Sequence, residues 1–428
     1  MSVVEQVELK TLERAGACAV QVIRVGFLGY GRVGQAVAEL ARSSDRLLAR
    51  GVDVRAAAAL VLDPSKPRLG GPVHLCTSPD SFFHRRLDVV IEVMGGVHPA
   101  YEYVKRALEA RIPVITANKS LMAAKGEELR AAALEHGVPL AFDAAVLAGV
   151  PFIGALSRRP FIGAPRRITG ILNGTSHFLS CALADGRAFD DALADAIDRG
   201  YAEPDSSADI SGRDAAEKLT ILVHLAGCRD LRATGLTRLG IDALSPLDFE
   251  AARAIGGVIK PIATASFDST NPGAWVGPAL VDAAHVAASS RGVHNFLELT
   301  GDGGPVTFAG PGAGPAVTAA TILDDLVEVA FGGPHDESAA LRAATTQLDL
   351  SQPAAGGWYI RVRGTSLQME DFAEHLATHR VPAVRIAAIQ GALVARTTTA
   401  SRDVANAALD ALHAIGADVL LLPVVEAN

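Results

Sequence analysis

A lysine that follows a cluster of carboxylates marks the stretch of this chain best equipped for chemistry. Within residues 196–218, four of the carboxylates, those of Glu203, Asp205, Asp209 and Asp214, lead into Lys218. Asp214 and Lys218 are four residues apart in a helical pattern, so both side chains share one face of the helix. A lysine held beside a carboxylate in a cleft can exchange a proton with a substrate oxygen if burial and neighbours shift its pKa. An ordinary surface ion pair has the same spacing, so the pair alone leaves both interpretations open.

Length, composition and charge indicate an ordinary globular protein with several cores. The 428 residues exceed what one core accommodates, and the length favours about three domains. The net charge of −8 is spread without a block of like charges, so we expect no nucleic-acid or membrane surface. The first 17 residues lack the apolar core of a secretory signal, and the four cysteines lack CxxC spacing. These features predict a cytoplasmic protein without a zinc site or a disulfide framework.

A glycine-rich turn between a strand-like run and a helical pattern predicts a dinucleotide-binding domain. Residues 20–28 are apolar and β-rich, and a helical pattern begins at Gln35. The turn between them has GxGxxG spacing and contains Gly29, Gly31, Arg32, Val33 and Gly34. Such glycines permit a tight turn, a close approach of the backbone to pyrophosphate and close helix packing, and the helix N-terminus faces the phosphates. A glycine-rich turn without a ligand is the less favoured alternative.

The next strand-like run, residues 54–62, leads to Asp63. An acid at the end of the second strand can accept hydrogen bonds from the adenosine ribose, which favours NAD. Lys66 and Arg68 follow closely and could instead meet the 2′-phosphate of NADP. The choice stays open, with a slight preference for NADP.

Alternating strands and helices continue to about residue 150 and predict a parallel, doubly wound sheet with ligands at the carboxyl ends of its strands. Glu92 and Thr116 fall at such ends. A strand-like pattern is also expected over residues 166–179. From about residue 355 onward, the elements read β-α-β-β-α-β, the split βαβ pattern.

Several strings resemble motifs of the homoserine dehydrogenase family. The string Asp-Ile-x-Gly-x-Asp-x-x-x-Lys from Asp209 to Lys218, after Gly-Tyr-Ala-Glu at 200–203, resembles the signature of that family. The strings at 92–96, 116–119 and 173–175 are similar to other motifs of the family, and the C-terminal pattern resembles an ACT domain. The resemblance implies an α/β protein with three domains. They are a Rossmann-type domain (1–150, with 311–335 returning to it), an α+β substrate and dimerisation domain (151–310), and a ferredoxin-like ACT-like domain (355–428).

The resemblance also implies an activity, the NAD- or NADP-dependent interconversion of L-homoserine and L-aspartate 4-semialdehyde in threonine and methionine biosynthesis. Lys218 would move the proton, Asp214 would hold its ammonium, and Lys119 would assist at the hydroxyl and the nicotinamide ribose. The substrate would contact Glu203, Asp209, Asp214, Asn173, Gly174 and Thr175. Besides the glycine-rich turn, the cofactor would contact Asp63, Lys66, Thr116, Lys119, Gly200 and Gly314.

A monovalent cation, Na⁺ or K⁺, is implied by the segment that follows Phe142. Its ligands would be the carboxylate of Asp143 and the backbone carbonyls of Val146, Ala148 and Val150, oxygen donors of the kind that hard cations prefer. Members of the family usually have glutamate where this chain has Asp143.

Two other functions remain open. His177, Leu147 and Ser206 depart from the family pattern and suggest a related dehydrogenase with another amino-acid substrate. A non-catalytic nucleotide or amino-acid sensor is the second alternative. In the C-terminal module, Arg363-Gly-Thr-Ser stands where ACT domains usually have Asp-x-Pro-Gly, so we expect a structural or dimerising role there. A homodimer is the default assembly.

Overall fold

The computed structural model describes residues 20–427 except 70, 151, 155–164 and 333–347. The N-terminal stretch that was judged not to be a secretory signal lies outside the described residues. The chain divides into two compact units. The first unit comprises residues 1–121, 128–144 and 314–336, and the second comprises residues 122–127, 145–313 and 337–428. No helix in the described ranges is long and apolar enough to cross a bilayer.

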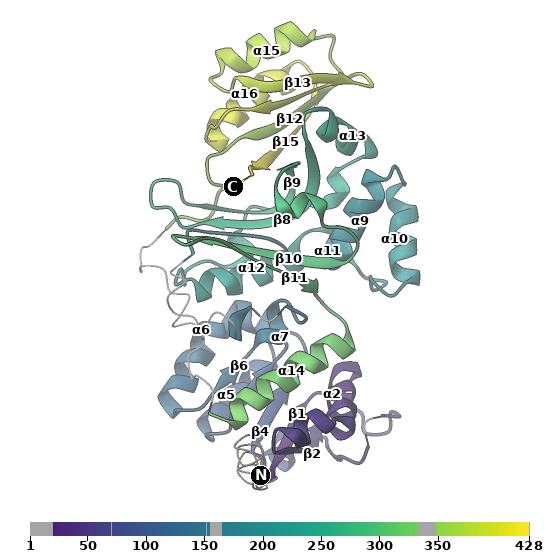
Figure 1. Cartoon of the computed structure of the whole chain (residues 1–428), viewed down its shortest axis with the longest axis vertical. Helices are drawn as coiled ribbons and strands as arrows, with labels where there is room; N and C mark the ends of the chain where they lie inside the picture. The colour runs from purple at the N-terminus through teal and green to yellow at the C-terminus, as the bar shows by residue number, and fades with distance from the viewer. Residues whose placement is uncertain (1–19, 70, 151, 155–164, 333–347, 428) are drawn as a thin grey trace, which may run out of the picture. The chain divides into compact units, whose positions relative to one another are not determined.

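The first unit is built on a six-stranded parallel sheet in the order β3-β2-β1-β4-β5-β6 (Figure 1). Its strands are β1 (Gln21–Leu28), β2 (Val52–Leu60), β3 (His74–Cys76), β4 (Val89–Glu92), β5 (Val114–Thr116) and β6 (Leu140–Ala141). The order reverses between β1 and β4, which is the switch point at which dinucleotides bind in open α/β sheets. The predicted doubly wound sheet is therefore confirmed.

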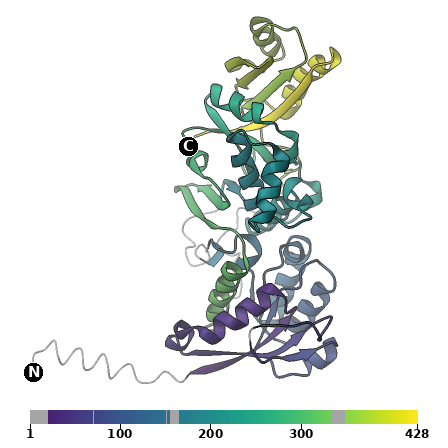
Figure 2. The ribbon, with the colours of Figure 1, turned by 90° about the vertical axis from the view of Figure 1, so that its right-hand side faces the viewer.

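Amphipathic helices connect and cover these strands. They are α2 (Arg32–Ser43), α3 (Asp45–Ala49), α4 (Pro79–Phe83), α5 (Ala100–Glu109) and α6 (Lys119–His136), and the short α7 (Asp143–Val146) follows β6. Between the two longer stretches of the second unit, residues 145–313 and 337–428, the chain returns to the first unit as α14 (Pro315–Ala330), which packs beside α2 (Figure 2). Ile322 and Leu326 of α14 are fully buried in the same core as Val37 and Phe27. Residues almost 300 positions apart in the sequence thus share one core.

The second unit contains a nine-stranded sheet in the order β11-β10-β7-β8-β9-β15-β12-β14-β13. Its first five strands are β7 (Arg167–Ile171), β8 (Gly257–Ser266), β9 (Gly273–Asp282), β10 (His294–Gly301) and β11 (Gly304–Pro311). Its helices before β8 are α9 (Gly174–Ala184), α10 (Phe189–Asp198), α11 (Ser207–Ile210), α12 (Arg213–Leu225) and α13 (Pro246–Ala254). Short 3₁₀ turns span Ala233–Gly235, Ile241–Ala243 and Val286–Ser289.

The strand expected over residues 166–179 is wrong beyond Ile171. β7 ends there, and α9 begins at Gly174. Asn173 decides the boundary because its extended backbone and its side-chain oxygen, 2.7 Å from the amide nitrogen of Ser176, cap the helix.

The C-terminal part has the predicted β-α-β-β-α-β order and forms an integral part of the second unit. It comprises β12 (Trp358–Arg363), α15 (Met369–Thr378), β13 (Ala383–Ile389), β14 (Ala392–Thr397), α16 (Arg402–Ala414) and β15 (Asp418–Val425). β15 pairs in parallel with β9 through Val424 and Val425. This pairing merges the module with the preceding sheet.

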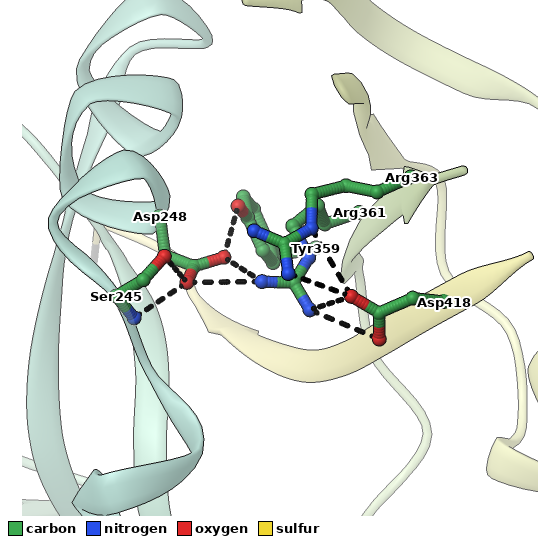
Figure 3. Close-up of polar contacts among 6 residues, drawn as sticks. All are labelled: Ser245, Asp248, Tyr359, Arg361, Arg363 and Asp418. Carbon is green, nitrogen blue, oxygen red and sulfur yellow. Dashed lines mark hydrogen bonds and ion pairs between the residues drawn. The ribbon is translucent and has the colours of Figure 1, made fainter. Parts of the chain in front are cut away.

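A buried ionic network joins α13 to strands β12 and β15 (Figure 3). The Nη1 atom of Arg361 lies 3.0 and 3.1 Å from the two carboxylate oxygens of Asp248, and its Nη2 atom lies 3.2 Å from Asp418 Oδ2. Arg363 contacts Asp418 from the exposed side at 3.0 Å. Asp248 is completely buried and also accepts hydrogen bonds from the backbone amide and hydroxyl of Ser245 at the start of α13.

Candidate active site

In the second unit, the side chain of Asn173 contacts two carboxylates and the start of a helix. While its side-chain oxygen caps α9, its Nδ2 donates to Asp209 Oδ1 at 2.6 Å and to Asp214 Oδ2 at 2.8 Å. Asn173 and Asp214 are 6 % and 5 % exposed. One amide therefore fixes two carboxylates that lie 36 and 41 residues further along the chain.

Lys218 completes this cluster from α12. Its Nζ atom lies 2.9 Å from Asp214 Oδ2 and 2.8 Å from the carbonyl oxygen of Leu172. Lys218 is 8 % exposed, so the pair is not the exposed surface ion pair that its spacing also allowed. An ammonium has three donors, and the contacts to Asp214 and Leu172 are the ones that the described residues provide. Within the described residues, the third donor has no hydrogen-bond partner.

Glu203 and Thr175 lie on the same part of the second unit. Thr175 donates its hydroxyl to the carbonyl oxygen of Tyr201 at 2.7 Å, which ties the start of α9 to the loop that carries Glu203. Glu203 is exposed and makes no hydrogen bond or ion pair within the described part of the chain. Gly200, with φ of +72°, ends α10 and turns the chain into this loop. A free carboxylate beside the buried cluster suits recognition of an amino group.

His177 is a buried structural residue. It is fully buried, and its ring nitrogens lie 2.9 Å from the carbonyl oxygen of His294 and 3.2 Å from that of Ser290. Burial, together with the nearby ammonium of Lys260, lowers the pKa of His177 from 6.5 to about 4. A neutral imidazole has one N–H, so it donates to one of these two carbonyl oxygens and links α9 to residues 290–294. Ser206, also buried, accepts hydrogen bonds from the amides of Asp209 and Ile210 through its carbonyl oxygen.

The glycine-rich turn of the first unit fits a dinucleotide pyrophosphate. Gly29 has φ of +85°, and a Cβ there would lie 3.0 Å from the carbonyl oxygen of Val93. Gly31 precedes α2 without a side-chain cap, and a Cβ built on it would meet no described atom within 4 Å. The first amides of α2 are thus open to an anion, and the backbone can be approached closely. Arg32, Val33 and Gly34 form the first turn of this helix.

Asp63, the acid expected to contact the adenosine ribose, accepts hydrogen bonds from a residue of its own turn. β2 ends at Leu60, so Asp63 lies beyond the strand. Its Oδ1 accepts hydrogen bonds from the amide and the hydroxyl of Ser65, at 2.9 and 2.6 Å. These hydrogen bonds lower the pKa of Asp63, with Lys66 and Arg68 adding to the effect. The guanidinium of Arg68 donates to the carbonyl oxygens of Asp63 and Lys66, so two cations border this turn.

The carboxyl ends of β4 and β5 meet at Glu92, which the sequence placed at the end of a strand and in a family-like string but gave no role. Glu92 Oε2 lies 2.5 Å from the hydroxyl of Thr116, and its Oε1 accepts a hydrogen bond from the amide of Met94 at 2.7 Å. Burial raises the pKa of Glu92, while these hydrogen bonds oppose the rise. Lys119 is the first residue of α6, directly after the N-cap Asn118.

The remaining predicted residues are divided between the units. Asp143, 8 % exposed, belongs to the first unit, and the other expected cation ligands Val146, Ala148 and Val150 belong to the second. Gly314 precedes α14 in the first unit. Within the described ranges, no cluster of His, Cys, Asp and Glu side chains suits a metal ion.

Comparisons with known proteins agree with this geometry. The family model described as the NAD-binding domain of homoserine dehydrogenase matches residues 29–143, and the model described as homoserine dehydrogenase matches residues 151–327. Homoserine dehydrogenase from Synechocystis is 34 % identical over 322 residues, covering 72 % of this chain and 73 % of that protein. The chain belongs to the homoserine dehydrogenase family.

Relatives and solved structures extend the match. Homoserine dehydrogenase from Pseudomonas aeruginosa is 36 % identical over 313 residues, covering 72 % of each chain. A crystal structure of a homoserine dehydrogenase from Thiobacillus denitrificans has a TM-score of 0.86 at 31 % identity and covers 95 % of this chain and 99 % of that one. The S. aureus enzyme, at pH 8.5, has a TM-score of 0.78 at 27 % identity over the same shares. The structural matches thus include the C-terminal module.

Proposed function

We propose that this chain catalyses the NAD(P)-dependent interconversion of L-homoserine and L-aspartate 4-semialdehyde, a step of amino-acid biosynthesis. The observation that carries the proposal is the buried Asn173–Asp214–Lys218 cluster. The cluster holds one ammonium by two contacts and leaves it a donor for a substrate oxygen. Family membership supports the same activity.

Proton transfer falls to Lys218. In reduction the ammonium of Lys218 donates its third proton to the developing alkoxide, and in oxidation the neutral amine of the same side chain takes that proton from the substrate hydroxyl. Asp214 and the Leu172 carbonyl oxygen hold Nζ in place, and Asn173 in turn orients Asp214. The nicotinamide, when bound, takes up or supplies the hydride. Glu203 binds the amino group of the substrate, with Asp209 held nearby through Asn173.

The dinucleotide is proposed to lie on the glycine-rich turn, with Thr116 and Lys119 on its nicotinamide side. Gly200 and Gly314 are further proposed contacts of the cofactor. We propose NADP as the preferred form. Oδ1 of Asp63 already accepts two hydrogen bonds from Ser65, while Lys66 and Arg68 offer positive charge to a 2′-phosphate.

The assay is the appearance of reduced nicotinamide when the chain is mixed with L-homoserine and either NAD⁺ or NADP⁺ at alkaline pH. Lys218→Met should lower kcat by about 10²- to 10⁴-fold, the usual worth of general acid–base catalysis, with little change in cofactor affinity. Lys260→Met is the matched control, because Lys260 is another buried lysine, 6 % exposed, outside the cluster. If Lys218→Met kept kcat within a fewfold of the parent, Lys218 would have no part in the reaction.

The alternatives have distinct signatures. A sensor binds the dinucleotide without turnover in the same assay, and a related dehydrogenase prefers a homoserine analogue by kcat/KM. The burial of His177 against backbone carbonyl oxygens supports homoserine over an altered substrate.

The proposal also includes a monovalent cation, a homodimer and the three domains delimited above. The buried carboxylate of Asp143 and the backbone oxygens of Val146, Ala148 and Val150 support the cation, because hard cations prefer oxygen ligands. Light scattering during size-exclusion chromatography measures the assembly directly.

A further inference from the structure

A completely buried carboxylate joins two loops of the first unit. Glu92 ends β4, is 0 % exposed, and accepts hydrogen bonds from the amides of Met94 and Gly95 in the loop that follows. It also accepts the hydroxyl of Thr116, the last residue of β5, at 2.5 Å and the Nδ2 of Asn118, in the loop that follows, at 3.3 Å. The two loops are therefore held by one side chain.

Asn118 carries the connection on to the next helix. Its Nδ2 also donates to the carbonyl oxygen of Gly96 at 2.7 Å, and its Oδ1 accepts the amide of Leu121 at 3.1 Å. The second contact caps α6, whose first residue is Lys119. The backbone amide of Asn118 donates to the hydroxyl of Thr116 at 3.0 Å. Glu92 thus influences where α6 begins.

The position of this network in the sheet indicates which part of a dinucleotide it serves. In doubly wound sheets the two mononucleotide halves lie on either side of the switch point, which is here between β1 and β4. The glycine-rich turn and Asp63 lie on the β1 and β2 side, where the adenosine half binds. Glu92 and Thr116 end β4 and β5, so their loops lie on the nicotinamide side.

A charged carboxylate at this buried position lowers stability unless its hydrogen-bonding geometry is needed. Burying a charge costs free energy unless donors compensate for the lost water. All donors to Glu92 within the described residues come from two segments, residues 94–95 and 116–118, and no cation contributes. A carboxylate offers about four acceptor sites on two oxygens, which matches the four donors that the two segments supply.

We infer that Glu92 is a positioning residue for the nicotinamide half of the dinucleotide, acting through Thr116 and Asn118. It keeps the loops 94–96 and 116–118 in register and sets the start of the helix that carries Lys119. The inference rests on the dinucleotide binding of the proposed function and is independent of the substrate.

Binding measurements can separate this role from general damage. NADPH and adenosine 2′,5′-bisphosphate, which lacks the whole nicotinamide half, are titrated calorimetrically into the parent and into Glu92→Gln. The glutamine keeps the shape, but its amide group faces the Thr116 hydroxyl with a donor and leaves that hydroxyl without its acceptor. We expect NADPH affinity to fall about tenfold to a hundredfold, the range for loss of a buried hydrogen bond to a charged group. The affinity for the fragment should stay within about twofold of the parent.

Two further variants make the result decisive. Thr116→Val removes the same contact from the other side, so the double variant with Glu92→Gln should lose little more than either single variant. It also supplies the measurement if Glu92→Gln does not fold. Glu298→Gln is the matched control, because Glu298 is a carboxylate buried to a similar degree in the second unit, 3.6 Å from His285. This control should leave both affinities unchanged.

Three outcomes would overturn the inference: equal losses for NADPH and the fragment, no loss for either, or a parent that binds both ligands equally well. A parent that binds NADPH more tightly than the fragment, but does not oxidise homoserine, would instead refute the proposed substrate and leave the role of Glu92 intact.

Discussion

Replacing Arg361 with methionine should lower the free energy of unfolding of the second unit by about 3 to 5 kcal/mol, the usual cost of removing one partner of a buried ion pair. Arg361 is 5 % exposed, and Asp248 is completely buried. After the change, Asp248 retains the amide and hydroxyl of Ser245, at 2.8 and 2.9 Å, and a longer contact of 3.4 Å to the hydroxyl of Tyr359. All three donors are neutral, so the buried charge would lose its counter-ion.

Tryptophan fluorescence during urea unfolding measures this effect selectively. The two tryptophans of the chain, Trp275 and Trp358, are 4 % and 1 % exposed, and both belong to the second unit. Arg363→Met is the matched control, because Arg363 contacts Asp418 with a side chain that is 43 % exposed. Exposed pairs contribute at most about 1 kcal/mol.

Adding Asp248→Asn to Arg361→Met should recover part of the lost stability, since no buried charge then remains. The reasoning would be refuted if Arg361→Met unfolded within about 1 kcal/mol of the parent, no further than the exposed pair accounts for.

Three other predictions concern pH, cofactor and salt. Because the folded pKa of His177 is lowered to about 4, its contribution to stability is fully present above the unfolded pKa of 6.5 and is lost as pH falls through the folded value. The loss is about 3 kcal/mol at most, and His177→Asn should flatten urea midpoints over this range. A slope equal to that of the parent would contradict the prediction. Arg68→Ala should lower kcat/KM for NADP⁺ about tenfold and leave that for NAD⁺ within twofold, since a charged hydrogen bond to the 2′-phosphate is lost; equal losses would exclude a 2′-phosphate contact. Replacing Na⁺ and K⁺ with tetramethylammonium should lower activity in the parent but have little further effect in Asp143→Ala, and an unchanged parent would rule out the cation.

Local sequence patterns predicted most helices and strands. They could not predict contacts between residues that are distant in the sequence. The GxGxxG turn could be recognised because a strand, three glycines and a helix follow one another directly. The end of β7 was missed because the apolar residues on both sides of Asn173 fit a strand, although Asn173 itself is a typical helix N-cap. The burial of Glu92 and of His177 depends on neighbours distant in the sequence. The Asp214–Lys218 spacing was visible, but only the contacts to Asn173 and Leu172 distinguish the pair from a surface ion pair.

The pairing of β9 with β15 has a consequence for synthesis on the ribosome. β9 emerges about 140 residues before β15, which at about 5 to 20 residues per second leaves its outer edge without that partner for roughly 7 to 30 seconds. An apolar strand with a free edge is a template for pairing with other chains, and nine of the ten residues of β9 are buried once the sheet is complete. The nascent protein should therefore depend on chaperone protection during this interval, and truncations that remove β15 should accumulate as aggregates.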